Sequence, residues 1–329
     1  MDWENKKVLI TGAGGFIGSH LTERLVELKA KVKAFVRYNA RNDRGLLEIL
    51  PKHIQDKIDV FVGDLKDPES VRRAVKNMEI IFHLGAIIPI PYSYLDPRNV
   101  FETNALGTMN VLNAVREYGI ERMIHTSSSE VYGTACYTPI DEKHSLQAQS
   151  PYAASKIAAD KLVESFYLSY ELPVATIRPF NTYGPRQSAR AVIPTIITQA
   201  LTGDKVLLGA MNPKRDFLYV EDTVNGFIKV AESENTIGET LNIGTGIAIS
   251  IGDLVDKIIA IIGKKVDVIF DATRIRPEKS EVKYLIADNA KAKRLIGWEP
   301  KVSLDDGLKK TVEWVEQSLN LYKVYIYNV

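Results

Sequence analysis

The chain has one cysteine, Cys136, among its 329 residues. A single thiol excludes a disulfide within the chain and any metal site built from several cysteines. Neither sign of charge is in excess, because 42 basic residues stand against 41 acidic ones. No electrostatic field therefore favours nucleic acid or an anionic membrane, and an anionic ligand would have to be held by local groups.

Long apolar runs are also missing, since none approaches the roughly 20 residues that span a bilayer. The first seven residues lack the apolar core of a signal peptide. We expect a soluble, cytoplasmic protein with no membrane or nucleic-acid partner. With 45% hydrophobic and 25% charged residues, the composition is typical of a globular chain. At this length, the chain can bury an α/β core together with a second lobe.

A glycine-rich turn, TGAGGFIG at residues 11–18, separates a short apolar segment from an amphipathic one. Its glycines Gly12, Gly15 and Gly18 give the spacing Gly-x-x-Gly-x-x-Gly. Glycines allow a tight turn, and the unpaired N–H groups of a following helix suit a dinucleotide pyrophosphate. The alternative is a tight connection without a ligand. The position directly after a first strand favours a dinucleotide site.

In the first half of the chain, short apolar segments alternate with amphipathic ones. The predicted strands are Lys7–Thr11, Lys31–Val36, Asp59–Val62, Ile80–Leu84, Met123–Ser127 and Val174–Pro179. The predicted helices are Ser19–Leu28, Pro68–Lys76, Asn104–Tyr118 and Tyr152–Tyr170. This alternation predicts an α/β fold with a Rossmann-type, doubly wound parallel sheet covered by helices on both faces.

After Pro179 the alternation becomes irregular. The elements predicted there are helices at Pro194–Thr202, Ser250–Ile262 and Leu304–Ser318 and a strand at Lys205–Leu208. We predict an NAD(P)-binding Rossmann domain at residues 1–179, with a return segment at about 216–248. Residues 180–215 and 249–329 would form a smaller, discontinuous α/β domain that binds the substrate.

Tyr152 and Lys156 are four residues apart and so share one face of the predicted helix. A nearby ammonium group favours a phenolate, so Tyr152 could act as a base near neutral pH. The same spacing also occurs by chance, as an exposed tyrosine beside a solvated lysine. The neighbouring motifs favour the catalytic interpretation.

Hydroxyl groups and a carboxylate follow the fifth predicted strand in TSSSEVYG, residues 126–133. The carboxyl end of a strand in a parallel sheet faces the ligand crevice. Hydroxyls such as that of Ser128, with the carboxylate of Glu130, could bind a sugar hydroxyl there and move a carbon-bound proton. The alternative is a serine-rich turn that caps backbone groups, and we prefer this interpretation for Ser127.

Together these motifs resemble, in their order, the extended short-chain dehydrogenase/reductases that act on nucleotide sugars. The resemblance covers about residues 6–317 and also includes GDL at 63–65, HLGA at 83–86, NxxGT at 104–108 and RPFNTYGP at 178–185. Ser129-Glu130 resembles the nucleotide-sugar 4,6-dehydratases, with serine as in the GDP-mannose dehydratase branch. Segments 91–94, 178–195 and 276–282 resemble dehydratases that act on nucleotide-linked N-acetylglucosamine in pseudaminic or legionaminic acid biosynthesis.

The resemblance implies a role for each catalytic residue. Tyr152 would take the proton of the sugar 4-hydroxyl, which Ser128 would bind, while a hydride leaves C4. Lys156 would lower the pKa of Tyr152 and hold the nicotinamide ribose. Glu130 would remove the C5 proton as water leaves C6. Ser129 replaces an aspartate that protonates the leaving hydroxyl in many relatives, so either Glu130 returns its own proton or Ser129 relays one through water.

The second predicted strand leads into Arg37, where an NAD site usually has an acidic residue for the ribose 2′-hydroxyl. A guanidinium suits a 2′-phosphate better, so we predict NADP, with NAD as the alternative. Arg41 and Arg44 could also bind the 2′-phosphate, but it is equally plausible that they belong to a solvated basic loop without a ligand. By resemblance, Asp64 would bind the adenine. The full predicted dinucleotide set is Gly12, Gly15, Phe16, Ile17, Gly18, Arg37, Asp64, Leu65, Leu84, Ala86, Tyr152 and Lys156.

The resemblance also implies which residues hold the nucleotide sugar. Arg215 and Arg276 match positions that grip the diphosphate, and Asn181 would donate to a phosphate oxygen. The full predicted substrate set is Ser128, Asn181, Arg190, Val192, Arg215, Arg276 and Glu278. No metal site is predicted, and His83 and His125 are interpreted as strand-end residues. A homodimer or homotetramer is implied, through helices 104–118 and 152–170.

The predicted reaction is the 4,6-dehydration of UDP-N-acetylglucosamine, with the GDP form as the alternative substrate. Two other activities stay open. UDP-glucuronate decarboxylases share the Ser-Glu-Val-Tyr-Gly sequence, and Arg186 or Arg190 could supply the arginine that they need. Nucleotide-sugar 4-epimerases usually lack a carboxylate at the position of Glu130. A non-catalytic dinucleotide sensor is a further alternative, but sensors typically lose the tyrosine or the lysine, which are both present here.

Overall fold

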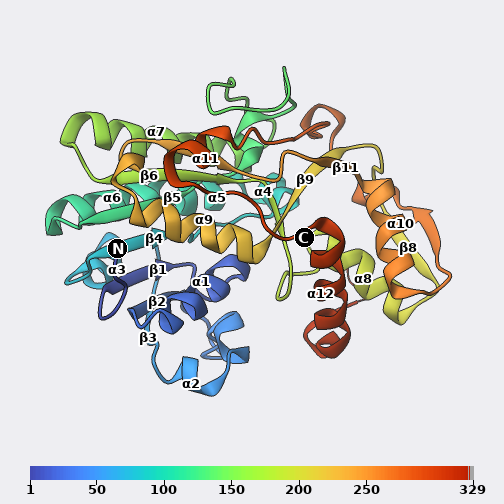
Figure 1. Ribbon diagram of the computed structural model, residues 1–329, viewed down its shortest axis with the longest axis horizontal. Coiled ribbons are helices and arrows are strands. Elements are labelled where there is room, and N and C mark those ends of the chain that lie inside the picture. The colour runs from blue at the N-terminus through green and yellow to red at the C-terminus, as the bar shows by residue number, and fades with distance from the viewer. Residues whose placement is uncertain (325, 327–329) are drawn as a thin grey trace.

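Seven parallel strands form the central sheet of the computed structural model, which describes residues 1–324 and 326 (Figure 1). The strands are β1 Lys7–Thr11, β2 Lys31–Arg37, β3 Asp59–Gly63, β4 Ile80–His83, β5 Arg122–Thr126, β6 Val174–Pro179 and β10 Thr240–Ile243. Their order is β10-β6-β5-β4-β1-β2-β3. The chain moves outward from β1 in both directions, so the predicted Rossmann-type topology is confirmed. The ligand crevice of such a sheet lies at the carboxyl ends of β1 and β4.

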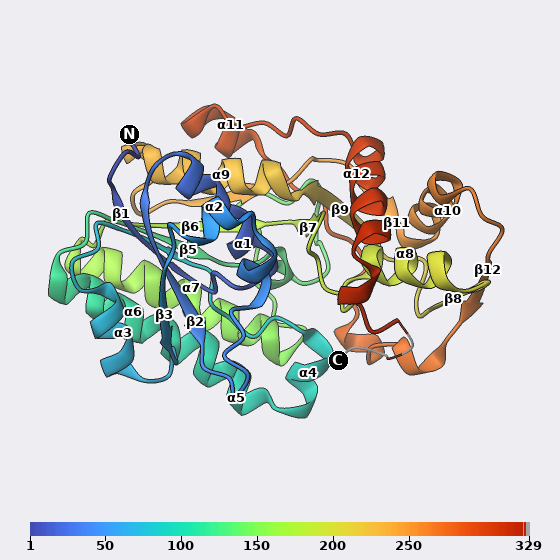
Figure 2. The same cartoon turned by 90° about the horizontal axis from the view of Figure 1, so that it is seen from below.

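Helices cover both faces of this sheet (Figure 2). Helices α1 Phe16–Glu27 and α9 Val220–Glu232 lie on one face, and α3 Pro68–Val75, α6 Gly107–Tyr118 and α7 Pro151–Tyr170 lie on the other. Alternate residues of β1 face opposite sides, so Val8 and Ile10 join one buried apolar cluster whereas Leu9 joins the second. This arrangement explains why the central strands β1 and β4 are mostly apolar.

Beyond β6 the chain builds smaller sheets beside the large one. The three-stranded sheet has the order β11-β9-β7, and a two-stranded sheet pairs β12 with β8. Their bounds are β7 Asn181–Tyr183, β8 Lys205–Leu208, β9 Lys214–Tyr219, β11 Ala248–Ser250 and β12 Asp267–Phe270. Figure 2 shows α8 Val192–Thr202, α10 Ile251–Ile262 and α12 Leu304–Gln317 beside these strands. In between, α9 and β10 return to the large sheet. Residues 325 and 327–329 of the predicted segment 249–329 lie outside the described residues.

Several short elements were not predicted. They are α2 Lys52–Gln55, α4 Ile90–Leu95, α5 Pro97–Phe101 and α11 Ala290–Ile296. Helices α4 and α5 each have a proline in their first turn, where a missing N–H costs nothing. The predicted helix Asn104–Tyr118 is a π-helical segment, Glu102–Leu106, followed by α6. None of the helices in the described part of the chain has both the length and the apolar character needed to cross a bilayer.

Candidate active site

The glycine-rich turn joins β1 to α1 at the carboxyl edge of the large sheet. Gly12 has a φ of +72°, and a side chain there would meet the backbone nitrogen of Gly85 at 2.8 Å. Only glycine fits this close approach between the turn and the end of β4. Helix α1 has Gly15 as its N-cap, with no capping side chain and no acidic residue in its first turn. Its first N–H groups are therefore available to an anion, and the turn fits a dinucleotide pyrophosphate.

Other predicted dinucleotide residues gather around the same edge. The backbone nitrogen of Leu84 donates to the carbonyl of Thr11 at 3.2 Å. The side chain of Leu65 packs against Gly85, where an added Cβ would lie 2.6 Å from it. Arg37 on β2 pairs with Gly63 on β3, and Asp64 is the residue that follows Gly63. The ends of β2, β3 and β4 therefore surround the glycine turn.

The loop after β2 is folded back onto the glycine turn. Asn39 organises it, accepting from the nitrogen of Asp43 at 3.0 Å and donating to the carbonyl of Asp43 at 2.6 Å. The nitrogen of Leu46 donates to the carbonyl of Gly14 at 2.9 Å. Arg37 and Arg44 both line a hollow of about 120 Å³ beside this loop. Two cationic side chains thus lie where the second strand ends.

The predicted catalytic residues come from two elements beside the end of β5. Ser128 caps the short helix Ser129–Tyr132, accepting from the nitrogen of Glu130 at 3.2 Å, and Ser129 is buried in its first turn. Tyr152 lies in the first turn of α7, close enough to Ser128 and Glu130 for both to influence its phenol. Burial raises the pKa of Tyr152 to about 12, and the negative charge of Glu130 adds to this effect. The structure therefore brings Tyr152, Ser128 and Glu130 together.

The prediction that Lys156 lowers the pKa of Tyr152 is wrong for this arrangement. The ammonium group of Lys156 donates to the carbonyl oxygen of Thr126 at 2.5 Å. Desolvation of the phenol outweighs other influences on Tyr152, so its pKa rises. Burial also lowers the pKa of Lys156 to about 8, an effect that the charge of Asp160 partly opposes.

Asp160, one helical turn after Lys156, was not predicted as part of the site. Its carboxylate accepts from Ser127 Oγ at 2.8 Å and from Arg178 Nε and Nη2 at 3.1 and 2.8 Å. His125 Nε2 lies 3.2 Å from its other oxygen. Asp160 thus ties α7 to β5 and β6 behind the Tyr-Lys pair. The sequence contained a signal for this residue: Asp160 is four residues after Lys156, and this spacing puts both on the same face of the predicted helix.

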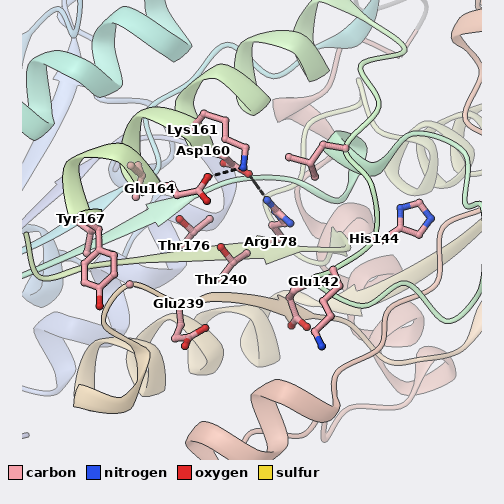
Figure 3. A pocket seen from close by; sticks show the side chains of 15 residues that line it. Glu142, His144, Asp160, Lys161, Glu164, Tyr167, Thr176, Arg178, Glu239 and Thr240 are labelled. Atoms are coloured by element: carbon pink, nitrogen blue, oxygen red, sulfur yellow. Dashed lines mark hydrogen bonds and ion pairs between the residues drawn. The ribbon is translucent and has the colours of Figure 1, made fainter. Parts of the chain in front are cut away.

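The interpretation of Ser127 as a backbone cap is also wrong. Its hydroxyl donates to the buried carboxylate of Asp160, and Ser128 takes the capping role. Figure 3 shows Asp160 and Arg178 at the wall of a polar cavity of about 300 Å³. Glu142 and Glu239 line it from another side. Its lining among the described residues includes no predicted site residue.

Arg215 on β9 reaches the catalytic group from the smaller sheet. Its guanidinium is buried, and Nη2 donates to Glu281 Oε1 at 3.1 Å. Arg276 Nη1 lies 3.9 Å from the same oxygen. Burial lowers the pKa of Arg215, and the charge of Glu130 opposes this effect. The structure thus brings Tyr152, Glu130 and Arg215 to one site; Glu281 was not predicted as part of it.

The remaining predicted substrate residues are Asn181, Arg190, Val192 and Glu278. Asn181 opens β7, next to β9, and its buried Oδ1 has no hydrogen-bond partner among the described residues. Val192 opens α8, whereas Arg190 and Glu278 are exposed. Within the described part of the chain, no hydrogen bond or ion pair joins Arg190, Val192 or Glu278 to the group around Tyr152.

The fold is a Rossmann-type sheet, and the glycine turn at its carboxyl edge fits a dinucleotide pyrophosphate. The family model described as GDP-mannose 4,6 dehydratase matches residues 9–311. The chain therefore belongs to this family of extended short-chain dehydrogenase/reductases, which includes nucleotide-sugar dehydratases and epimerases.

Known proteins of more than one activity are similar to the chain. It is 31% identical to a putative UDP-glucose 4-epimerase of Methanocaldococcus jannaschii, over 94% of this chain and 99% of that one. DesIV of Streptomyces venezuelae, a dTDP-glucose 4,6-dehydratase solved with NAD, is 27% identical with a TM-score of 0.87, covering 96% and 98%. The UDP-N-acetylglucosamine 4-epimerase of Methanobrevibacter ruminantium, solved with UDP-N-acetylmuramic acid, is 29% identical with a TM-score of 0.87, covering 96% and 99%.

Proposed function

We propose that the protein catalyses the NAD(P)-dependent 4,6-dehydration of a nucleotide-linked N-acetylglucosamine, with the UDP form favoured over the GDP form. The product would be the 4-keto-6-deoxy sugar. One observation carries the proposal: Tyr152, Ser128 and a half-buried Glu130 share a site with the buried cation Arg215. Phenol, carboxylate and phosphate-binding cation are the groups that this reaction needs.

The chain's own residues move the protons and orient the sugar. The bound dinucleotide would take a hydride from C4 and return it to C6. Tyr152 takes the proton of the 4-hydroxyl, and Ser128, whose side chain lies near the phenol, orients that hydroxyl. Lys156, whose ammonium group donates to the carbonyl oxygen of Thr126, would hold the nicotinamide ribose.

Glu130 carries the elimination. A ketone at C4 acidifies the C5 proton, which Glu130 removes as the C6–O bond breaks. The departing hydroxyl takes a proton, either that of Glu130 or one relayed through Ser129, and leaves as water. Arg215 and Arg276, which both approach the carboxylate of Glu281, would hold the diphosphate.

The choice of N-acetylglucosamine rests on the sequence resemblance of segments 91–94, 178–195 and 276–282. It is supported by the similarity to an epimerase named for UDP-N-acetylglucosamine. From the resemblance of those three segments we also propose that the product enters pseudaminic or legionaminic acid biosynthesis, in the cytoplasm. A 4-epimerase is the second candidate, because relatives of that name cover nearly the whole chain. Glu130 favours the dehydratase, since epimerisation at C4 needs no base for C5.

Product analysis tests the proposal. The protein is incubated with UDP- and GDP-N-acetylglucosamine and with UDP-glucuronate, and each product is identified by NMR and mass spectrometry. A product lighter by one water, with a C4 ketone, supports dehydration. UDP-N-acetylgalactosamine would indicate an epimerase, and a UDP-pentose would indicate a decarboxylase. No conversion of any substrate would favour the sensor role and contradict the proposal.

Replacing Glu130 with glutamine should stop dehydration. We expect a loss of about 10²- to 10⁴-fold, typical for a general acid–base group, because the amide cannot take the C5 proton. The measurement is exchange of the C5 hydrogen with solvent deuterium, followed by NMR, together with product formation. Glu164→Gln is the control, since Glu164 is an exposed residue of α7 paired with Lys161. Continued exchange in the Glu130 variant would mean that another base acts.

We also propose NADP as the dinucleotide, with NAD as the alternative. Arg37 and Arg44 beside the hollow at the end of β2 could hold a 2′-phosphate. Arg37→Ala should weaken NADP binding about tenfold or more and leave NAD binding nearly unchanged, as expected for one charge-assisted contact. Titration calorimetry with both dinucleotides measures this, with Arg41→Ala as the control from the same loop. Equal weakening of both would contradict the 2′-phosphate assignment.

We further propose a homodimer or homotetramer that pairs through α6 and α7. The segments packed against these helices leave large apolar side chains exposed, including Leu95, Phe101 and Leu106. Leu168, on α7 itself, is 72% exposed. Covering such a face with a second copy would remove this apolar surface from water.

A further inference from the structure

Helix α1 makes a second contact, through His20 and Glu23, which follow the glycine turn. Glu23 Oε2 accepts from Arg186 Nη2 at 2.6 Å, and only 21% and 13% of these side chains are exposed. One turn earlier, His20 Nε2 lies 2.9 Å from the carbonyl oxygen of Pro185. A carbonyl can only accept, so the ring donates this hydrogen bond. Because His20 and Glu23 share one helical face, they hold two successive residues of the same loop.

The loop that they hold, residues 184–191, leads into α8. Arg186 has a φ of +69°, in the left-handed region that residues other than glycine rarely adopt. Such a backbone persists only where its surroundings determine it. The side chain of Gln187 donates to the carbonyl of Thr182 at 2.8 Å, and Tyr322 donates to the carbonyl of Gln187 at 2.9 Å. The loop is therefore fixed in its first half, at Pro185–Gln187.

The ends of this loop connect residues predicted to bind the substrate. Asn181 lies shortly before it, and Arg190 and Val192 lie at its far end. Helix α1 itself begins at the glycine turn, where the pyrophosphate of the dinucleotide fits. One rigid helix thus contacts the dinucleotide site with its N-terminus and the substrate loop with a side face.

We propose that Glu23 is a positioning residue for the nucleotide sugar. Through Arg186 it fixes loop 184–191 relative to the dinucleotide helix, and it thereby sets the affinity of the site for the substrate's nucleotide diphosphate. This inference rests on the proposed function, because it assigns the loop to the same nucleotide-sugar site. Glu23 itself touches neither the substrate nor the dinucleotide.

Glu23→Gln removes the charge and keeps the shape of the side chain. We expect the KM for UDP-N-acetylglucosamine to rise about tenfold, as for the loss of a charge-assisted hydrogen bond. The kcat and the dinucleotide affinity should stay within about twofold, because the loop would bind the sugar nucleotide equally in the ground state and in the transition state. Glu27→Gln is the matched control on the same helix, since Glu27 pairs with Arg24 at 3.0 Å and is about half exposed. It should change none of these values.

The charge-exchanged double variant, Glu23→Arg with Arg186→Glu, should recover at least part of the lost affinity if the contact itself positions the loop. A lowered Tm with an unchanged KM in Glu23→Gln would overturn the inference and leave a purely structural ion pair. The same is true if KM and dinucleotide affinity weaken by one common factor.

Binding of UDP and of GDP, measured by calorimetry in parallel, separates this inference from the proposed reaction. If no nucleotide sugar is converted but nucleotide affinity still falls in Glu23→Gln and not in Glu27→Gln, the inference stands and the proposed reaction fails. Equal nucleotide affinity in the wild type and both variants overturns the inference. A wild-type protein that binds neither nucleotide overturns both.

Discussion

Tyr152→Phe is expected to stop turnover while leaving both ligands bound. The phenol is buried beside Ser128 and Glu130, and burial raises its pKa to about 12. It is the group placed to take the proton of the sugar 4-hydroxyl, and phenylalanine keeps the ring but cannot accept a proton. We expect a loss of about 10³-fold in kcat, within the range for a general base, with nucleotide affinity nearly unchanged.

Two measurements together check this result. Absorbance of reduced dinucleotide in a single turnover reports oxidation at C4, and calorimetry with UDP reports binding. Tyr170→Phe is the matched control, because Tyr170 lies at the exposed end of the same helix. Near-normal turnover of the Tyr152 variant would remove this tyrosine from the mechanism. Loss of UDP binding in the same variant would mean that its phenol shapes the site rather than serving as the base.

Local patterns in the sequence predicted most of the large sheet. Apolar runs marked β1 to β6 nearly to the residue, because strands buried on both faces are apolar throughout. The seventh strand, Thr240–Ile243, was predicted only as part of a return segment, because it is short and half of its residues, Thr240 and Asn242, are polar. Its Asn242 is buried, where it accepts from the hydroxyl of Tyr132 at 2.7 Å.

The catalytic cluster could be predicted because its members are close in sequence. Ser128 and Glu130 follow one strand, and Tyr152 and Lys156 share one helical face. What surrounds them could not be predicted in this way. Arg215 and Glu281 meet from positions 66 residues apart, so no local spacing reveals the pair. The direction of the Tyr152 pKa was also missed, because it depends on burial, which the sequence does not give.

Acidification from pH 6.5 to 4 is expected to destabilise the fold strongly, because of its buried histidines. His83 is enclosed between the hydroxyls of Thr11 and Thr108, at 2.8 and 3.0 Å, and stacks on His125 at 5.8 Å. Burial lowers the pKa of His125 and of His20 to about 4, and that of His83 well below its usual value of 6.5. All three are therefore neutral in the folded protein at neutral pH.

The sign follows from proton uptake. Between pH 6.5 and about 4, these histidines bind protons in the unfolded chain but not in the folded one, so the free energy of unfolding falls as the pH falls. For His125 alone the loss is roughly 3 kcal/mol, and similar losses at the other two would approach the total stability of a typical domain. Glu142 and Asp216 oppose this in part, because burial raises their pKa values. Asp160, with a pKa of about 2, lowers the free energy of unfolding further only below about pH 4.

Urea denaturation followed by circular dichroism at several pH values between 7.5 and 4 measures this dependence. His125→Gln keeps a donor for Asp160 but cannot gain a proton, so its free energy of unfolding should fall less steeply with pH than that of the wild type. His53→Gln is the control, because His53 is exposed and should leave the slope unchanged. Identical slopes for His125→Gln and the wild type would show that His125 does not contribute to the acid sensitivity of the fold.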